Sequence, residues 1–300
     1  MARQVSLRIL VTILLLSSLG SLFAQSRGAD KEIRKQIRFH NRSLILDPEH
    51  LPTYRARAEL YLQLGESDKA MADLEQAIRR KDTAWKTRFI RASLCMRTGN
   101  VEQASKDLEY VVQKVPNHIP SLNYLGLILV ERRAYNRAER LLSRVLSEQP
   151  EQIMARQNRG VAYFHLGKHE AAIADLEMVL ARDEQQAMVH ANLGLAYTAN
   201  EQIELGQTHL DRAIEINPLL AQAWYHRGLA RLQMNQPLNA LPEFDQAIAL
   251  DTAQADFHKW RGIALHLIGR TEEAQLNFRE ALALQPDIRI LYRGEDLTPK

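Results

Sequence analysis

Cysteine is almost absent from this sequence, and its scarcity excludes several classes of protein. The 300 residues include one cysteine, Cys95, so an intramolecular disulfide and a cysteine-rich zinc module are both ruled out. The net charge is also small, because 39 Lys and Arg residues are nearly balanced by 36 Asp and Glu residues. This near balance argues against nucleic acid as a partner, because a dedicated nucleic-acid binder usually carries a clustered basic face. The 46% hydrophobic and 25% charged shares are those of an ordinary globular protein and argue against disorder.

Catalytic motifs are missing as well. The sequence contains no HExxH, no GxSxG and no phosphate-binding GxxxxGK[ST] segment. His165 and His169 have the spacing of two zinc ligands, but Gly167 between them predicts a turn and no third ligand follows. Cys95 falls at an expected core position, which favours a buried, unreactive thiol. We therefore expect no catalytic activity, no metal and no cofactor.

Residues 1–24 have the pattern of a secretory signal peptide. Arg3 and Arg8 form a basic region before an apolar run, Ile9 to Leu16, and small residues follow up to Ala24. The stretch from Ile9 to Ala24 is 16 residues long, shorter than the roughly 20 that span a bilayer. We predict removal of this segment and export to the periplasm or the exterior. The alternative is an uncleaved anchor, which would be the chain's only membrane contact.

A spacing of 34 residues governs the rest of the chain. Nine of the 13 glycines fall in two phases of this spacing, as do five of the prolines in a third phase. The first glycine set is Gly126, Gly160, Gly194, Gly228 and Gly262, the second is Gly65, Gly99, Gly167 and Gly269, and the prolines are Pro48, Pro116, Pro150, Pro218 and Pro286. Counting from Leu51, seven repeats of 34 residues end at Ile288. Such a period is typical of a solenoid.

Each repeat has the pattern of a helical hairpin. In the fourth repeat Ala172, Ile173, Leu176, Val179 and Leu180 recur at three- and four-residue steps, which places them on one helical face. Glycine at repeat position 15 suits a left-handed residue between two helices, and proline at position 32 ends the second helix. Glycine or alanine at position eight predicts a close approach of the two helices, with Leu or Phe at position 24 filling the remaining volume.

The repeat resembles the tetratricopeptide repeat. In the sixth repeat Trp224, Gly228, Ala240, Phe244 and Ala247 match that pattern. The resemblance implies an all-α fold, a right-handed superhelical solenoid of antiparallel helix pairs whose first helices line a concave groove. It also implies a binding scaffold rather than an enzyme, although the fold alone does not name a ligand.

The flanks of the seven repeats are less regular. Residues 25–50 look like a degenerate half-repeat, in which Gln36, His40 and Ser43 replace the usual small and apolar residues. Residues 289–300 are expected to form a capping tail, and Ile288, just before it, with Ile290 and Leu291 should begin to cover the last hairpin.

Departures inside the repeats are few. Gly206 replaces an expected alanine and should loosen the fifth repeat slightly. Pro242 lies inside a predicted helix and should kink it, most simply as a harmless bend on the outer surface. The sequence assigns no role to Arg231 at a usually aromatic position.

The resemblance places eleven residues in the groove. Aliphatic residues at position nine of five consecutive repeats, together with nearby aromatics, indicate a partner if they are exposed. Asn158 and Asn192 share position six, where an amide can pair with an extended peptide backbone. The candidates are Phe89, Tyr124, Leu127, Asn158, Val161, Asn192, Leu195, Tyr225, Leu229, Trp260 and Ile263. The alternative is that part of this row packs against the next repeat.

These observations predict a non-catalytic adaptor of the cell envelope that binds a peptide segment or a helix of another protein in its groove. The alternative is a binding subunit for a polysaccharide or cell-wall strand, with the aromatic residues as stacking platforms. Six cations surround one turn: Arg79, Arg80, Lys81, Lys86, Arg88 and Arg91. They either steer an acidic partner or anionic lipid, or form a solvated rim.

Overall fold

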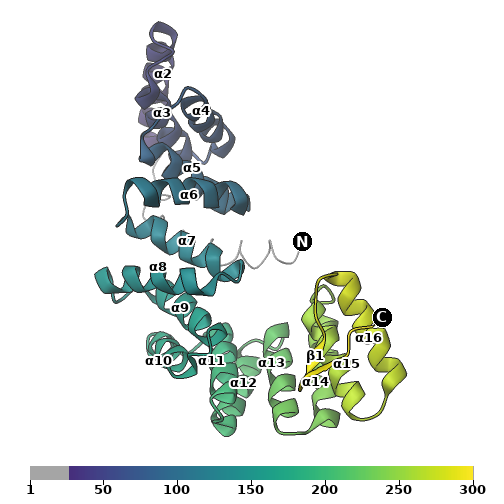
Figure 1. Cartoon of the computed structure of the whole chain (residues 1–300). Coiled ribbons are helices and arrows are strands. Elements are labelled where there is room, and N and C mark those ends of the chain that lie inside the picture. Colours follow the sequence, from purple (N-terminus) through teal and green to yellow (C-terminus); the bar gives the residue numbers. More distant parts are fainter. Residues whose placement is uncertain (1–26, 300) are drawn as a thin grey trace. The chain divides into compact units, whose positions relative to one another are not determined.

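The computed structural model describes residues 27–299, with side chains from Asp30 onward. The predicted signal segment therefore lies outside the described residues. The described part forms fifteen helices and a short hairpin (Figure 1), and its helices include none long and apolar enough to cross a membrane. The chain divides after Pro150 into two compact units, unit 1 before this point and unit 2 after it.

The elements of each unit follow one another as helix pairs. Unit 1 contains α2 (Arg27–Leu46), α3 (Leu51–Gln63), α4 (Ser67–Arg79), α5 (Trp85–Thr98), α6 (Val101–Lys114), α7 (Ile119–Glu131) and α8 (Tyr135–Glu148). Unit 2 contains α9 (Ile153–His165), α10 (His169–Leu180), α11 (Ala187–Ala199), α12 (Ile203–Ile216), α13 (Ala221–Gln233), α14 (Pro237–Leu250), α15 (Ala255–Leu267), α16 (Thr271–Leu284), β1 (Leu291–Tyr292) and β2 (Glu295–Asp296).

The first helix of every pair begins 34 residues after the previous one, at residues 51, 85, 119, 153, 187, 221 and 255. The predicted all-α solenoid of antiparallel helix pairs is confirmed. The exact division of the chain into signal, half-repeat, repeats and tail stays a prediction.

Small residues at position eight let the paired helices touch, as the sequence predicted. A Cβ atom on Gly228 would lie 2.5 Å from Cε1 of Phe244, and one on Gly126 would lie 2.5 Å from Cδ2 of Leu142. The position-24 side chains that occupy this space are fully buried. Glycine is needed here because backbone and side chain approach more closely than an alanine methyl allows.

Gly206 lies where two helices approach closely, and its effect on the stability of the fifth repeat stays a prediction. A Cβ atom on Gly206 would collide with Oγ1 of Thr198 and lie 2.8 Å from the carbonyl oxygen of Gly194. Helices α11 and α12 thus approach each other through glycine on both sides. The Thr198 side chain occupies the volume that an alanine at 206 would require.

Pro242 and Arg231 both find ordinary places in unit 2. Pro242 is exposed, and α14 continues past it to Leu250. The proline therefore interrupts the backbone hydrogen bonds of α14 on its solvent-facing side without ending the helix. Arg231 donates from Nη1 to Oε1 of Gln236 over 3.3 Å, which ties the end of α13 to the turn before α14.

A left-handed residue separates the helices of all seven pairs. Four are glycines with φ between 73° and 81°, as the sequence predicted. Arg133, Glu201 and Asn235 adopt the same conformation, with φ of 60°, 63° and 57°. Residues with a Cβ atom are strained there, so three repeats carry a local cost that glycine would remove.

Glu201→Gly should therefore raise the free energy of unfolding by about 0.5–1 kcal/mol, measured by urea titration followed by circular dichroism. The matched reverse change, Gly167→Glu, should lower it by about the same amount. Equal stability of Glu201→Gly and the unchanged chain would show that the left-handed turn carries no strain.

A recurring ion pair joins the two helices of four repeats, and the sequence analysis missed it. An arginine at position seven binds an acid at position 23: Arg57 with Asp73, Arg91 with Asp107, Arg159 with Asp175, and Arg227 with Glu243. In the third repeat Leu125 and Leu141 occupy the same two positions. The arginine and the acid are thus replaced together in the third repeat. This joint replacement was a signal for the contact that could be read from the sequence.

Candidate binding surface

Unit 1 holds three of the predicted groove residues. Phe89 is half-buried and meets the ring of His118 edge-on, with centroids 4.6 Å apart. Tyr124 is also half-buried, and burial raises the pKa of its phenol. Leu127 is 2% exposed. Its placement in an open groove was wrong, because the centre of α7 is apolar on all sides and is buried all round.

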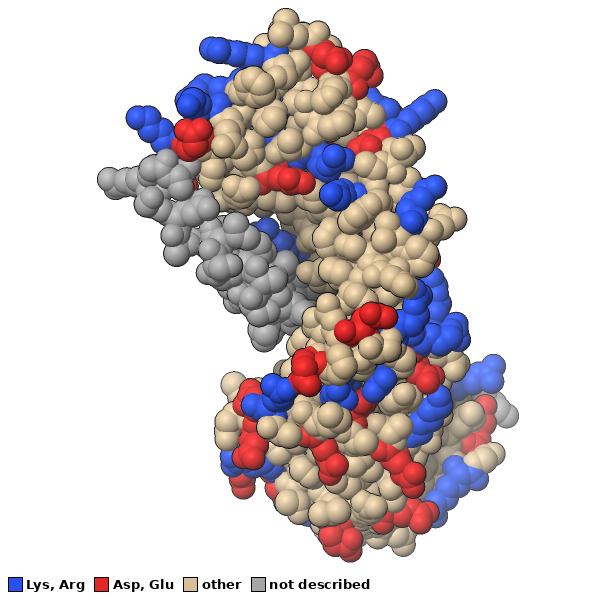
Figure 2. Space-filling model, turned by 90° about the vertical axis from the view of Figure 1, so that its left-hand side faces the viewer, with Lys and Arg blue, Asp and Glu red and all other residues tan. Residues whose placement is uncertain are grey.

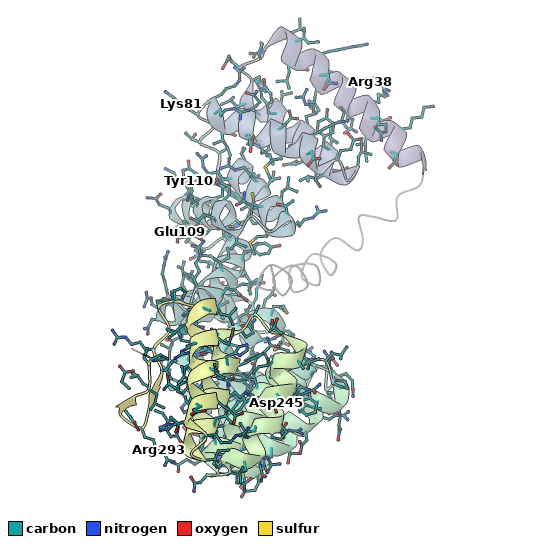
Figure 3. All side chains as sticks on the ribbon, turned by 90° about the vertical axis from the view of Figure 1, so that its right-hand side faces the viewer. Arg38, Lys81, Glu109, Tyr110, Asp245 and Arg293 are labelled. Atoms are coloured by element: carbon teal, nitrogen blue, oxygen red, sulfur yellow. The ribbon has the colours of Figure 1, made fainter. Side chains whose placement is uncertain are left out.

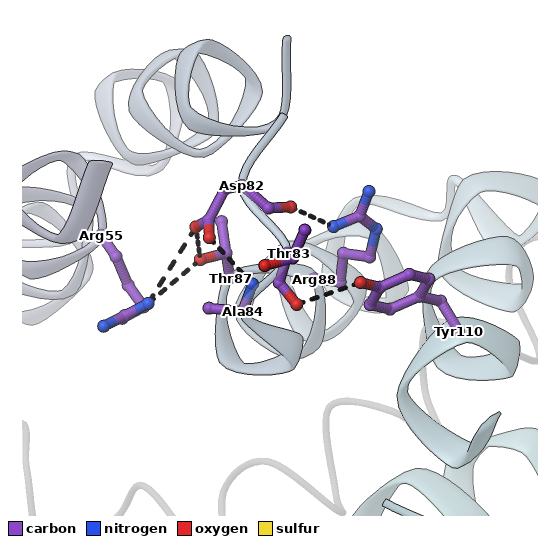
Figure 4. Close-up of polar contacts among 7 residues, drawn as sticks. All are labelled: Arg55, Asp82, Thr83, Ala84, Thr87, Arg88 and Tyr110. Carbon is purple, nitrogen blue, oxygen red and sulfur yellow. Dashed lines mark hydrogen bonds and ion pairs between the residues drawn. The ribbon is translucent and has the colours of Figure 1, made fainter. Parts of the chain in front are cut away.

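One of the six cations of unit 1, Arg88, contacts the turn between the first two repeats (Figure 4). Asp82 is buried there, and its carboxylate accepts hydrogen bonds from the Thr87 hydroxyl and the Ala84 N–H. Arg88 donates to the carbonyl of Asp82 over 2.7 Å and lies 4.0 Å above the ring of Tyr110. Tyr110 in turn donates to the carbonyl of Thr83 over 3.0 Å.

Three more of these cations are paired with carboxylates. Arg79 lies 3.5 Å from Glu75, Arg80 contacts Glu49, and Arg91 binds Asp107. The cluster is therefore mostly occupied by contacts within unit 1, which favours the structural interpretation over a free basic patch.

In unit 2 the first helices lie side by side, since α11 contacts both α9 and α13, and α13 contacts α15. Residues at the same repeat position are therefore neighbours across these helices. Six predicted groove residues of unit 2 remain partly accessible, and one of them, Trp260, contacts Tyr292 of the tail. We call the other five the accessible row: Val161, Asn192, Leu195, Tyr225 and Leu229. The row combines aliphatic side chains with one amide and one phenol.

Asn158 differs from its counterpart Asn192. It is 6% exposed, so the expected two-residue asparagine ladder is not open along its length. Its Nδ2 has no hydrogen-bond partner among the described residues. An unsatisfied buried donor costs about 1–3 kcal/mol, which a correctly placed acceptor would recover.

His226 occupies position six of the sixth repeat, the position of Asn158 and Asn192. It is buried, and its Nδ1 lies 3.2 Å from the carbonyl oxygen of Ala191 in the preceding first helix. Nδ1 therefore carries the proton that it donates, and burial lowers the pKa of the imidazole to about 4. The sequence analysis missed this residue, although its shared repeat position was a signal.

The tail of the chain packs at the end of the row that α15 forms. Ile263 is 0% exposed and packs in one cluster with Ile290 and Leu297 of the tail. The ring of Trp260 meets Tyr292 edge-on, with centroids 6.4 Å apart. The assignment of Ile263 to an open groove was wrong, because it is buried in a cluster that includes these tail residues. Figure 1 shows the tail hairpin beside the last helices.

The tail is a hairpin rather than a simple extension. Arg293 and Gly294 form its two-residue turn, both with positive φ, and Leu291 pairs with Asp296. Of the residues expected to cover the last hairpin, Ile288 and Ile290 are buried whereas Leu291 is half exposed. Leu297, which the sequence analysis did not consider, is buried in its place.

Reactive chemistry is sparse. Among residues 30–299 no three His, Cys, Asp or Glu side chains are grouped to hold a metal. The Nδ1 atoms of His190 and His209 lie 2.9 Å apart beside a cavity of about 270 Å³, and Tyr197 stacks on His209. Cys95 is buried, and this burial raises the pKa of its thiol to about 11, well above that of a nucleophilic cysteine.

Comparisons with known proteins agree on the fold. No protein of the curated set matches the sequence. A solved thermophilic repeat protein of Thermus thermophilus is 23% identical over 56% of this chain and 92% of its own, with a TM-score of 0.53. YrrB, described as a repeat protein with an unusual peptide-binding site, is 20% identical over 63% of this chain and 97% of its own, with a TM-score of 0.55.

A third structure, a repeat protein from Parabacteroides merdae, covers 88% of this chain and 100% of its own at 14% identity and a TM-score of 0.51. A family model described as the tetratricopeptide repeat matches residues 55–118, 125–187 and 227–287. Those matches span more than half of the sequence. The chain belongs to the tetratricopeptide repeat family.

Proposed function

We propose that this protein is a non-catalytic scaffold that binds a peptide segment or a helix of a partner protein along the first helices of unit 2. The observation that carries the proposal is the accessible row, in which Val161, Leu195 and Leu229 lie at the same position of successive first helices. A line of aliphatic side chains left in contact with water is typical of a surface that a partner covers.

The polar groups of the row favour a peptide as that partner. Asn192 offers both a donor and an acceptor to an extended backbone. Proteins of this family are generally protein-interaction scaffolds, and the similar fold of YrrB is associated with a peptide-binding site.

The polysaccharide alternative has less support, because the aromatic rings have other contacts. Tyr225 packs against Phe257 with centroids 4.8 Å apart, and Trp260 meets Tyr292 of the tail. Stacking on a sugar would require these faces to be free. Nothing in the described residues favours catalysis, so a scaffold remains the function that the surface supports best.

We further propose that the protein acts outside the cytoplasm, in the periplasm or beyond. The basic and apolar pattern of residues 1–24 supports export. Cleavage after Ala24 is tested by the N-terminal sequence of the protein recovered from the cell envelope.

Binding along the row is tested by capture from an envelope extract. Leu195→Ser with Leu229→Ser should lower capture of the partner about tenfold, because two central apolar contacts are lost. The matched control is Leu205→Ser with Leu238→Ser, which alters exposed leucines of the second helices.

The captured protein is then identified by mass spectrometry, and overlapping peptides from it are titrated against both variants. Equal capture by the row variant and the control would contradict the proposal. Retention of glycan without any protein would support the polysaccharide alternative instead.

A further inference from the structure

Helix α2 of unit 1 presents two different faces. On one face Ile33, Ile37 and Leu44 are buried, where Ile33 and Ile37 pack against Leu60 of α3 and Leu44 packs against Tyr54. Since this contact anchors α2 to the first repeat, the opposite face points away from the unit. No other described helix precedes α2 to cover that face.

The outward face of α2 is basic. Lys31, Lys35, Arg38 and Arg42 are exposed and recur at steps of three and four residues, the spacing of one helical face, and exposed Arg34 lies beside them. Arg34 is paired with Glu66 and Lys35 with Glu32. Lys31, Arg38 and Arg42 have no acidic partner among the described residues. Figure 3 shows Arg38 pointing away from unit 1, and Lys and Arg side chains project around this end of the unit (Figure 2).

Large apolar side chains share the same face. Phe39, Ile45 and Leu46 are 66%, 77% and 86% exposed, which places them among the most exposed large hydrophobic residues of the described chain. A helix face that contacts only water gains no stability from exposing these three apolar side chains. Binding to a membrane interface strengthens with the apolar area that is buried and with the attraction of Lys and Arg to anionic lipids, and this face offers both.

We propose that the outward face of α2, from Lys31 to Leu46, binds the surface of an anionic lipid bilayer. The cations contact lipid headgroups, and Phe39, Ile45 and Leu46 enter the boundary between headgroups and acyl chains. Nucleic acid or an acidic protein would satisfy the cations but not the apolar residues. The proposal differs from the expectation that residues 1–24 provide the only membrane contact, because α2 lies on the surface and spans nothing.

The test follows the environment of α2 in the full chain. A polarity-sensitive dye is attached to a Leu46→Cys variant, in which buried Cys95 with its raised pKa reacts slowly. Emission is recorded with vesicles of phosphatidylcholine alone and of equal parts phosphatidylcholine and phosphatidylglycerol. The dye should leave water only with the anionic vesicles, and added salt should reverse the change. The same dye on a Leu219→Cys variant, in unit 2, should not respond.

Charge-matched variants distinguish binding through the outward face of α2 from general electrostatic attraction between the protein and anionic vesicles. Replacing Lys31, Arg38 and Arg42 with glutamine should weaken partitioning to anionic vesicles about a hundredfold. The control replaces Lys86, Lys114 and Arg140, also in unit 1, and should bind as the unchanged chain does. Phe39→Ser should weaken partitioning without altering its salt dependence.

Three results would overturn the proposal. One is an unchanged emission at residue 46 with anionic vesicles. Another is an equal loss of binding in the triple glutamine variant of α2 and in the control, which would indicate attraction by net charge and not by this face. The third is a response to polyglutamate and none to vesicles, which would assign the face to an acidic polypeptide.

Discussion

Arg91→Ala should lower the free energy of unfolding by about 3–5 kcal/mol, among the largest effects of any single substitution in unit 1. Arg91 donates from Nε and Nη2 to both carboxylate oxygens of Asp107, over 2.7 and 2.8 Å. The Asp107 side chain is buried, so removing its partner leaves an uncompensated charge away from water. Hydrogen bonding to Asp107 also raises the pKa of Arg91. Urea titration followed by far-ultraviolet circular dichroism measures the loss.

The third repeat supplies the control for this prediction. Leu125 and Leu141 replace the ion pair there, and the two helices still pair. The double change Arg91→Leu with Asp107→Leu should therefore stay within about 1 kcal/mol of the unchanged chain or exceed its stability. If Arg91→Ala and the double variant lose equal stability, the loss comes from packing and not from the orphaned charge.

Acidification from pH 7 to pH 4 should remove about 3 kcal/mol of stability through His226 alone. The buried imidazole has a pKa of about 4, below the ordinary value of 6.5 that it regains on unfolding. Between these pKa values the imidazole binds a proton in the unfolded chain but stays neutral in the folded chain. The contribution is thus complete above pH 6.5 and is lost progressively as the pH falls toward 4.

His226→Asn isolates this effect from that of the carboxylates. Asparagine already occupies the same repeat position at 158 and 192, and its amide N–H replaces the donor to Ala191. Free energies of unfolding are measured for both proteins at several pH values, and the difference between them is followed. The unchanged chain should lose about 3 kcal/mol more than the variant between pH 7 and pH 4. Parallel pH profiles would show that His226 titrates normally in the folded state.

The sequence by itself determined the helix pairs and their contacts within a repeat. Close approach at Gly228 and Phe244 follows from residues 16 apart in one hairpin, and the left-handed turn at Gly167 follows from adjacent residues. These features depend on local geometry that every repeat shares, so periodicity alone shows them. The ion pair of Arg91 and Asp107 was readable in the same way, although it was missed.

Only the tertiary structure decided which residues of the first helices stay open to a partner. Leu127, Leu195 and Ile263 share one repeat position, yet Leu127 and Ile263 are buried while Leu195 is accessible. Ile263 is covered by Ile290 and Leu297, which reach it only after the chain turns back on itself. Exposure depends on what packs from elsewhere in the chain, and a repeat pattern contains no information about such distant neighbours.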